Sequence, residues 1–175
     1  LDNMFYNCKS LINLDISTFD TSNVQYMNSM FKGCISLTSI DLSHFNTGRV
    51  YSFSSMFESC TSLEEINLNN FDISQARYMS NMFKNCGNLA TIDFSKFKSG
   101  KNLLFGINGM FHNCTSLSLI DLSKLNLTQF NSDYYEYDFS NLFTGINGKG
   151  VLIYTNGLIP TKIQNIFPHK QMNKL

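Results

Sequence analysis

Five cysteines recur at one position of a repeating pattern, and their chemistry is the first question that the sequence raises. They are Cys8, Cys34, Cys60, Cys86 and Cys114. Evenly spaced thiolates suggest a metal site, but steps of 26 residues are not zinc-ligand spacing, and none of the three histidines shares a motif with a cysteine. Disulfides between adjacent turns of a stacked chain are geometrically possible, although five cysteines cannot all pair. We expect Cys34, Cys60 and Cys86 to be buried, unpaired and unmetallated.

Carboxylates form a second column with the same period. It consists of Asp15, Asp41, Asp93 and Asp121, with Asn67 at the remaining position. Like charges directly opposite one another on neighbouring strands are destabilising, so serine hydroxyls, backbone N–H groups or a cation should offset the repulsion. One interpretation is an acidic stripe that binds a cation or a basic partner. We favour the other, in which each Asp is hydrogen-bonded within its own repeat.

The acidic column is poorly suited to metal binding and to catalysis. Calcium takes about six to eight oxygen ligands, and a flat stripe of Asp and Ser offers fewer. Glycoside hydrolysis needs two carboxyl groups in different environments, whereas equivalent positions of a repeat share one environment. The sequence contains no Gly-rich phosphate loop, G-x-S-x-G or H-E-x-x-H motif. We therefore expect no enzyme activity, no metal and no cofactor.

The repeat that creates these columns also predicts the fold. Blocks such as "MFKGCISLTSIDLSHF" (30–45) begin at Met4, Met30, Met56, Met82 and Met110, at steps of 26, 26, 26 and 28 residues, and a degraded block begins at Leu142. Such a period is typical of repeat architectures, in which each unit buries its apolar face against its neighbours. The equivalent Met, Phe and Cys residues should therefore form buried columns.

Two different hydrophobic periodicities within one block predict its local structure. Ile40 and Leu42 alternate with polar residues, which is typical of a short strand with one buried face. Before it, residues 24–34 place apolar side chains at helical spacing, and Thr21, Ser22 or Asn23 could cap a short helix. We predict an α/β leucine-rich-repeat solenoid of about 26 residues per repeat. Short parallel strands line its concave face, and short helices or 3₁₀ turns line its convex face.

The boundaries follow from where the pattern holds. The solenoid should cover residues 1–143, and because residue 1 falls in the middle of a repeat we expect a fragment. Residues 144–175 should form a C-terminal cap, since terminal repeats of such stacks are atypical. In this cap Leu152 and Tyr154 take the places of Ile120 and Leu122 as a last strand, and a short helix is expected over 160–167.

The unit pattern "MFxxCxSLxxIDLSxFxT" resembles the BspA-like leucine-rich repeat of bacterial and mycoplasma surface lipoproteins. The resemblance covers residues 1–126. It implies a surface protein, often an adhesin that binds host or matrix proteins, and it carries no shared catalytic residues. Similar repeats occur in proteins of large DNA viruses. Two departures are an extra two residues in "KSGKNLLFGING" and an extra six in "TQFNSDYYEYDFSN".

The longer insertion is the most individual feature of the chain. It places Tyr134, Tyr135 and Tyr137 among acidic residues. Insertions in repeat proteins fall in loops, often on the binding face, and tyrosine is enriched at interfaces. The alternative is that these tyrosines shield the last regular repeat before the cap. We name Tyr134, Tyr135 and Tyr137, with the aspartates of the acidic column, as candidate partner-binding residues.

Composition narrows the choice of function. The net charge is zero, hydrophobic residues are 43% and charged residues 15%, which suits a folded core and argues against nucleic acid as a partner. No apolar run is long enough to span a membrane. We expect a non-enzymatic protein-binding or adhesion module, located at a cell surface or outside the cell. Its alternative is a structural tile of a larger assembly, such as a surface layer or virus particle.

Overall fold

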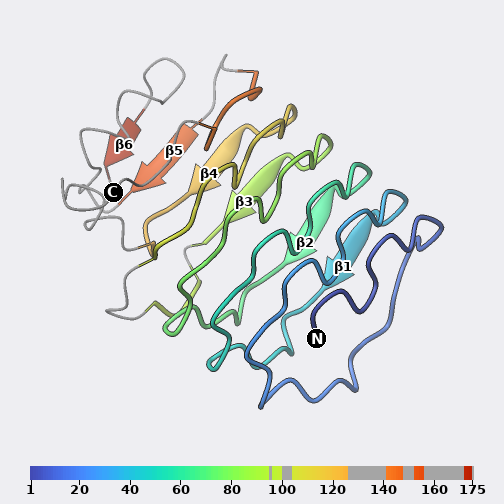
Figure 1. Ribbon diagram of the computed structural model, residues 1–175. Coiled ribbons are helices and arrows are strands. Elements are labelled where there is room, and N and C mark those ends of the chain that lie inside the picture. Colours follow the sequence, from blue (N-terminus) through green and yellow to red (C-terminus); the bar gives the residue numbers. More distant parts are fainter. Residues whose placement is uncertain (95, 100–103, 126–140, 148–151, 156–171, 175) are drawn as a thin grey trace.

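Successive repeats lie side by side in the computed structural model, and from the second repeat onward they carry short strands at equivalent positions (Figure 1). The structure describes residues 1–94, 96–99, 104–125, 141–147, 152–155 and 172–174. Its strands are β1 (Ser39–Asp41), β2 (Glu65–Asn67), β3 (Thr91–Asp93), β4 (Leu119–Asp121), β5 (Leu152–Thr155) and β6 (Met172–Lys174). All neighbouring pairs are parallel, in one sheet of order β1-β2 and another of order β3-β4-β5-β6. The predicted short parallel strands are confirmed.

Strands β1 and β2, and strands β3 and β4, pair in the register that the period predicts, although β2 and β3 belong to different sheets. Ile40 lies opposite Ile66, and Ile92 lies opposite Ile120. At β5 the predicted strand is present, but its register was predicted wrongly by one residue, because Ile153 rather than Leu152 lies opposite Ile120. Strand β6, which the sequence did not predict, pairs with β5. The helix expected over 160–167 lies outside the described residues.

The short helices expected over residues 24–34 do not form, and the described part of the chain contains no helix. The N–H groups of Met27, Ser29, Phe31 and Gly33 instead donate to carbonyl oxygens of the next repeat, at 2.8–3.0 Å. Their acceptors are Ser52, Ser54, Met56 and Glu58. Between them, local turns close from Lys32 N–H to Ser29 O at 3.2 Å and from Cys34 N–H to Phe31 O at 3.1 Å. The apolar residues at helical spacing therefore lie in consecutive tight turns, and these turns are hydrogen-bonded to the neighbouring repeat.

Left-handed residues within these turns explain why a helix is excluded. Ser29 has φ 53° and Gly33 has φ 77°, and the equivalent residues of other repeats are Asn, Ser or Gly with φ between 53° and 81°. These residue types tolerate the left-handed region best. Gly33 is also constrained by space, because a Cβ atom there would collide with the Asn7 side chain of the preceding repeat. The turns thus need Asn, Ser or Gly twice per repeat.

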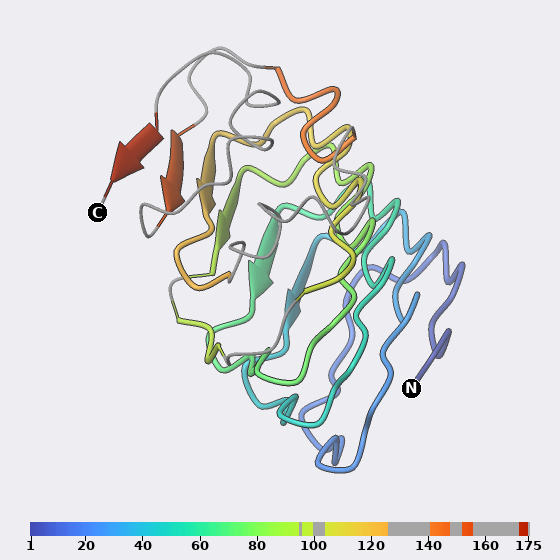
Figure 2. The ribbon, with the colours of Figure 1, turned by 60° about the vertical axis from the view of Figure 1, so that its left-hand side comes forward.

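The core lies between the strands and the turn segments, which Figure 2 shows along opposite sides of the stack. The rings of Phe31 and Phe57 stack with centroids 5.5 Å apart and planes at 6°, and those of Phe57 and Phe83 stack at 5.7 Å and 5°. Met30, Met56, Met82 and Met110 are fully buried beside them. The predicted apolar columns are confirmed. Met4, in the first repeat, is 47% exposed because only one neighbouring repeat covers it.

Buried threonines join the same repeats on their polar side. The Thr21 hydroxyl donates to Asn46 O at 3.1 Å and accepts from Asn46 N–H at 2.8 Å. One repeat further on, Thr47 makes the same pair of bonds with Asp72, at 3.0 and 2.7 Å. Both threonines are 1–2% exposed, so these bonds satisfy hydroxyls that would otherwise be costly to bury. They hold adjacent repeats together at the corner that follows the strand.

Candidate functional site

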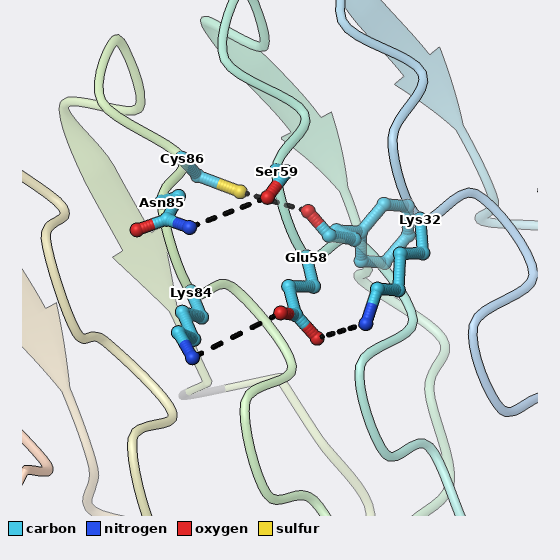
Figure 3. Close-up of polar contacts among 7 residues, drawn as sticks. Lys32, Glu58, Ser59, Lys84, Asn85 and Cys86 are labelled. Atoms are coloured by element: carbon cyan, nitrogen blue, oxygen red, sulfur yellow. Dashed lines mark hydrogen bonds and ion pairs between the residues drawn. The ribbon is translucent and has the colours of Figure 1, made fainter. Parts of the chain in front are cut away.

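The cysteine column is a structural feature of the interior. The Cys34 S–H donates to Phe5 O at 3.1 Å, and Cys60, Cys86 and Cys114 donate in the same way to Phe31, Phe57 and Phe83, each at 3.0–3.1 Å. Figure 3 shows the Cys86 sulfur pointing toward the preceding repeat. These four cysteines are buried free thiols, as predicted for Cys34, Cys60 and Cys86, whereas Cys8 is exposed.

Burial also controls the reactivity of these thiols. It raises the pKa of Cys34 to about 11 and that of Cys60 and Cys114 to about 12. A nucleophile or a metal ligand must be a thiolate, and these groups stay protonated near neutral pH. Among the described residues, no three or more His, Cys, Asp or Glu side chains cluster in a way that could hold a metal ion.

Three aspartates of the acidic column are hydrogen-bonded within their own repeats, as we favoured. A carboxylate oxygen of Asp41 accepts from Ser43 N–H at 2.9 Å, and Asp15 and Asp121 accept from Ser17 and Ser123 at 3.0 and 2.8 Å. The backbone bonds from Ser17 and Ser43 are the main cause that lowers the pKa of Asp15 and Asp41. Asp15, Asp41 and Asp93 are exposed and Asp121 is buried. A partner-binding role for these four aspartates stays a prediction.

A short charge ladder crosses three repeats on the turn side. Glu58 lies between Lys32, with Oε2 to Nζ at 2.9 Å, and Lys84, with Oε1 to Nζ at 4.0 Å (Figure 3). Burial raises the pKa of Glu58, but hydrogen bonds from Lys32 and Ser55 and the charges of both lysines outweigh it, so the net pKa is lowered. Because its charges are paired with one another, the ladder has no unpaired charge that would attract a charged ligand.

Aromatic residues form a line across four repeats that the sequence analysis missed. This aromatic row consists of Tyr26, Tyr51, Tyr78 and Phe105. Successive ring centroids lie 6.1, 5.6 and 6.3 Å apart, with the three tyrosines packed edge to face. The tyrosines are 46%, 37% and 40% exposed, and Phe105 is half-buried. The three tyrosines therefore present an aromatic surface to solvent.

A second line of parallel pairing positions the row. Isolated bridges join Tyr26 to Ser52, Ser52 to Tyr78, and Tyr78 to Gly106. Tyr51 precedes the bridged residue of its repeat by one position, as does Phe105, so the rings alternate between two adjacent columns. This alternation produces the edge-to-face contacts. It also explains why a search for one residue type at a strict period of 26 did not find the row.

Arginines and amides surround the middle of the row. The Arg77 guanidinium lies 6.0 Å from the Tyr51 ring centroid and 5.2 Å from that of Phe105, within the range of cation–π attraction. The Arg49 Nη1 donates to Asn23 Oδ1 at 2.7 Å. A shallow open pocket beside Tyr26 and Tyr51 is lined by Gln25, Gly48, Arg49 and Gln75. Aromatic, amide and guanidinium groups are thus available on one surface.

The predicted binding loop is not among the described residues. Tyr134, Tyr135 and Tyr137 fall outside the described residues, so their proposed role stays a prediction. The two-residue insertion is accommodated between Lys98, which bridges Asp72 at the ordinary step of 26, and Gly106, which bridges Tyr78 at a step of 28. No described helix has the length and apolarity to cross a membrane.

Fold and surface together define a tandem-repeat protein whose units pair through short parallel strands and whose cysteines serve the core. Within that class, the chain belongs to the family described as "Mycoplasma protein of unknown function, DUF285". The family pattern matches residues 1–124 and, in a second overlapping match, residues 67–144. No curated protein matches the chain.

Proposed function

We propose that this chain is a non-enzymatic protein-binding module of a surface protein, used for adhesion, and that its scaffold is a BspA-like leucine-rich-repeat solenoid. Short parallel strands at equivalent positions of the repeats from the second onward, in-register isoleucines and a continuous apolar core support the scaffold assignment. Membership of a mycoplasma family is consistent with the BspA-like pattern. The cysteines and aspartates that could have carried chemistry are engaged in structural hydrogen bonds, which favours binding over catalysis.

The aromatic row is the observation that carries the proposal. Solvent-exposed Tyr51 packs between the equally exposed Tyr26 and Tyr78, and the cationic Arg77 lies near the Tyr51 ring. Tyrosine and arginine are enriched among the residues that dominate protein interfaces, because each brings a large contact area and a polar group. Their exposed rings are not needed to close the core, which lies behind them. A protein partner is therefore the occupant that this surface favours.

An adhesion assay tests the proposal directly. Beads coated with the chain should adhere to at least one member of a panel of immobilised extracellular-matrix proteins. A variant with Tyr26, Tyr51 and Tyr78 changed to Ser should lose about tenfold or more of that binding, as expected for central interface residues. Tyr6→Ser is the matched control, since Tyr6 is 48% exposed and lies outside the row. Thermal unfolding of each variant separates lost binding from lost folding.

Two results would count against this function. Adhesion to none of the matrix proteins would remove its basis, and adhesion unaffected by the triple substitution would move the interface to the acidic column or to Tyr134, Tyr135 and Tyr137. The structural-tile alternative predicts concentration-dependent self-association instead. Sedimentation velocity over a range of concentrations distinguishes a monomeric adhesin from a chain that assembles with its own copies.

A further inference from the structure

We infer that the aromatic row binds an extended, acidic peptide segment of the protein partner. This inference rests on the proposed protein-binding function and specifies the chemistry of the partner. It is carried by three features of the row: its linear course across the repeats, its amide-lined groove, and arginines without carboxylate partners.

The course of the row favours a long, narrow ligand. Tyr26, Tyr51, Tyr78 and Phe105 belong to four consecutive repeats, and parallel strands repeat at about 4.8 Å. An extended chain advances about 3.3 Å per residue, so roughly five residues would cross all four rings. The pocket beside Tyr26 and Tyr51 is open and shallow, and the neighbouring one continues along Asn23, Val24, Gln25 and Tyr26. Such a groove suits a strand-like segment better than a compact small molecule.

The polar groups along the groove match a peptide backbone. Gln25 is exposed and lines the pocket, one repeat before Tyr51. An amide side chain donates and accepts hydrogen bonds, so it can pair with both the N–H and the C=O groups of an extended peptide. The tyrosine hydroxyls add further donors and acceptors at the edges of the rings. Apolar side chains of the peptide would contact the exposed parts of the rings.

The charges along the row select an acidic segment. In the described part of the chain, neither Arg49 nor Arg77 lies within ion-pair distance of a carboxylate, whereas Lys32 and Lys84 both pair with Glu58. Two carboxylates flank the row, but Asp2 accepts from Asn28 N–H at 2.7 Å and Asp72 accepts from Ser74 N–H at 2.9 Å. Because Arg77 is half-buried against two rings, its planar guanidinium is preorganised for bidentate pairing with a carboxylate.

A peptide-display selection tests the inference on the intact chain. A library of random linear peptides is panned against the immobilised protein, and enriched peptides are resynthesised with a fluorescent label. We expect enrichment of Asp and Glu over the unselected library. Binding of the enriched peptides should fall about tenfold or more in the Arg49→Gln, Arg77→Gln double variant, and it should weaken with added salt. Lys124→Gln, which removes an exposed cation away from the row, should leave binding unchanged.

The possible outcomes separate this inference from the broader function. Peptides that require Tyr51 and Tyr78 but show no acidic excess and ignore the arginine substitutions would overturn the acidic partner and leave a protein-binding row. Peptides that bind the tyrosine and arginine variants as well as they bind the wild type would overturn both the acidic-peptide inference and the aromatic row as the binding surface. A library without binders overturns the peptide inference, while the matrix-adhesion assay still decides the function. Arginine-dependent binding of heparin or single-stranded DNA, with no acidic peptide bound, would replace the peptide with a polyanion.

Discussion

At the scale of single residues, the cysteine position is explained by a carbonyl group rather than by reactivity. Each buried Cys lies beside the carbonyl of a Phe in the preceding repeat, at 3.0–3.1 Å. A thiol is small and apolar enough for the core, and its S–H is a weak donor that can satisfy this oxygen. The sequence correctly predicted burial of these thiols. It could not predict the acceptor, because residues 29 or 31 positions apart meet only through the stacking of repeats.

The exposure of Cys8 makes the reactivity of this column testable. We expect a thiol reagent to modify Cys8 rapidly in the native protein and to modify Cys34, Cys60, Cys86 and Cys114 only on unfolding. Burial keeps the latter thiols protonated by raising their pKa, to about 12 for Cys60. Mass spectrometry of the native and denatured protein after timed labelling measures the difference. Rapid modification of Cys60 in the folded chain, or a mass deficit that reveals a bridge, would contradict the structural assignment.

The raised thiol pKa values also predict how alkali affects stability. A group whose folded-state pKa lies above its unfolded value contributes stability in full below the unfolded pKa and loses it as pH rises through the folded pKa. For Cys60 this window runs from the ordinary value of 9.0 to about 12. The sign is therefore destabilisation by alkali, and neutral solutions are unaffected.

Asp41 provides the matching test for the acidic column. Its carboxylate accepts from Ser43 N–H, and Asn67 makes the same bond to Asn69 N–H at 3.2 Å one repeat further on. Asp41→Asn should therefore change thermal stability little near neutral pH, because the amide oxygen keeps the acceptor. Asp41→Ala removes the acceptor and should lower the unfolding temperature more. A large loss of stability in the Asn variant would mean that the charge itself, or a cation that it binds, is structural.

At the scale of elements, stacked phenylalanines hold the repeats together. Phe57 is fully buried, and its ring stacks on Phe31 at 5.5 Å and on Phe83 at 5.7 Å. We expect Phe57→Ala to lower the free energy of unfolding by about 3–5 kcal/mol, the usual cost of removing a large core side chain and leaving a cavity. Chemical denaturation monitored by circular dichroism measures this loss. Phe5→Ala is the internal comparison and should cost less, because Phe5 is only partly buried.

The Glu58 ladder links the same repeats through charge, and its contribution should depend on pH. Glu58→Gln should lower the free energy of unfolding by roughly 1 kcal/mol near neutral pH, since the paired lysines are about one-third exposed and partly screened. A lowered carboxyl pKa contributes stability above the unfolded value and loses it as pH falls through the folded value. The difference between wild type and variant should thus shrink as pH drops below the ordinary 4.5. A difference independent of pH would refute the ion-pair explanation.

The turn segments show where sequence reasoning fails at this scale. Alternation at Ile40 and Leu42 correctly predicted a strand, because a period of two has few other structural meanings. The apolar spacing of residues 24–34 fits two structures equally well. One is a helix, and the other is a series of tight turns that are hydrogen-bonded to the next repeat. The deciding signal was present in Ser29, Gly33 and their equivalents, which are Asn, Ser or Gly in every repeat. Two left-handed positions four residues apart are incompatible with a right-handed helix.

At the scale of the whole molecule, the period predicted the interior far better than the surface. Core columns are strict because each side chain must fit the equivalent one in the next repeat. Surface residues escape this constraint, so the aromatic row alternates between two columns. Function therefore has to be sought where the period is broken. Tyr51 and Arg77 are candidate functional residues because they depart from the repeat pattern, as does the insertion that contains Tyr134.

A stack in which each repeat contacts only its neighbours should also unfold from its less covered parts. In the first repeat Met4 is 47% exposed, whereas its counterparts Met30 and Met56 are fully buried. We expect amide hydrogens of residues 3–7 to exchange faster than those of residues 55–59, although both segments donate to the following repeat at 2.7–2.9 Å. Their local hydrogen bonds are alike, so the difference must come from coverage by adjacent repeats. Hydrogen exchange followed by mass spectrometry resolves the two segments, and equal protection would show that the described repeats open as one cooperative unit.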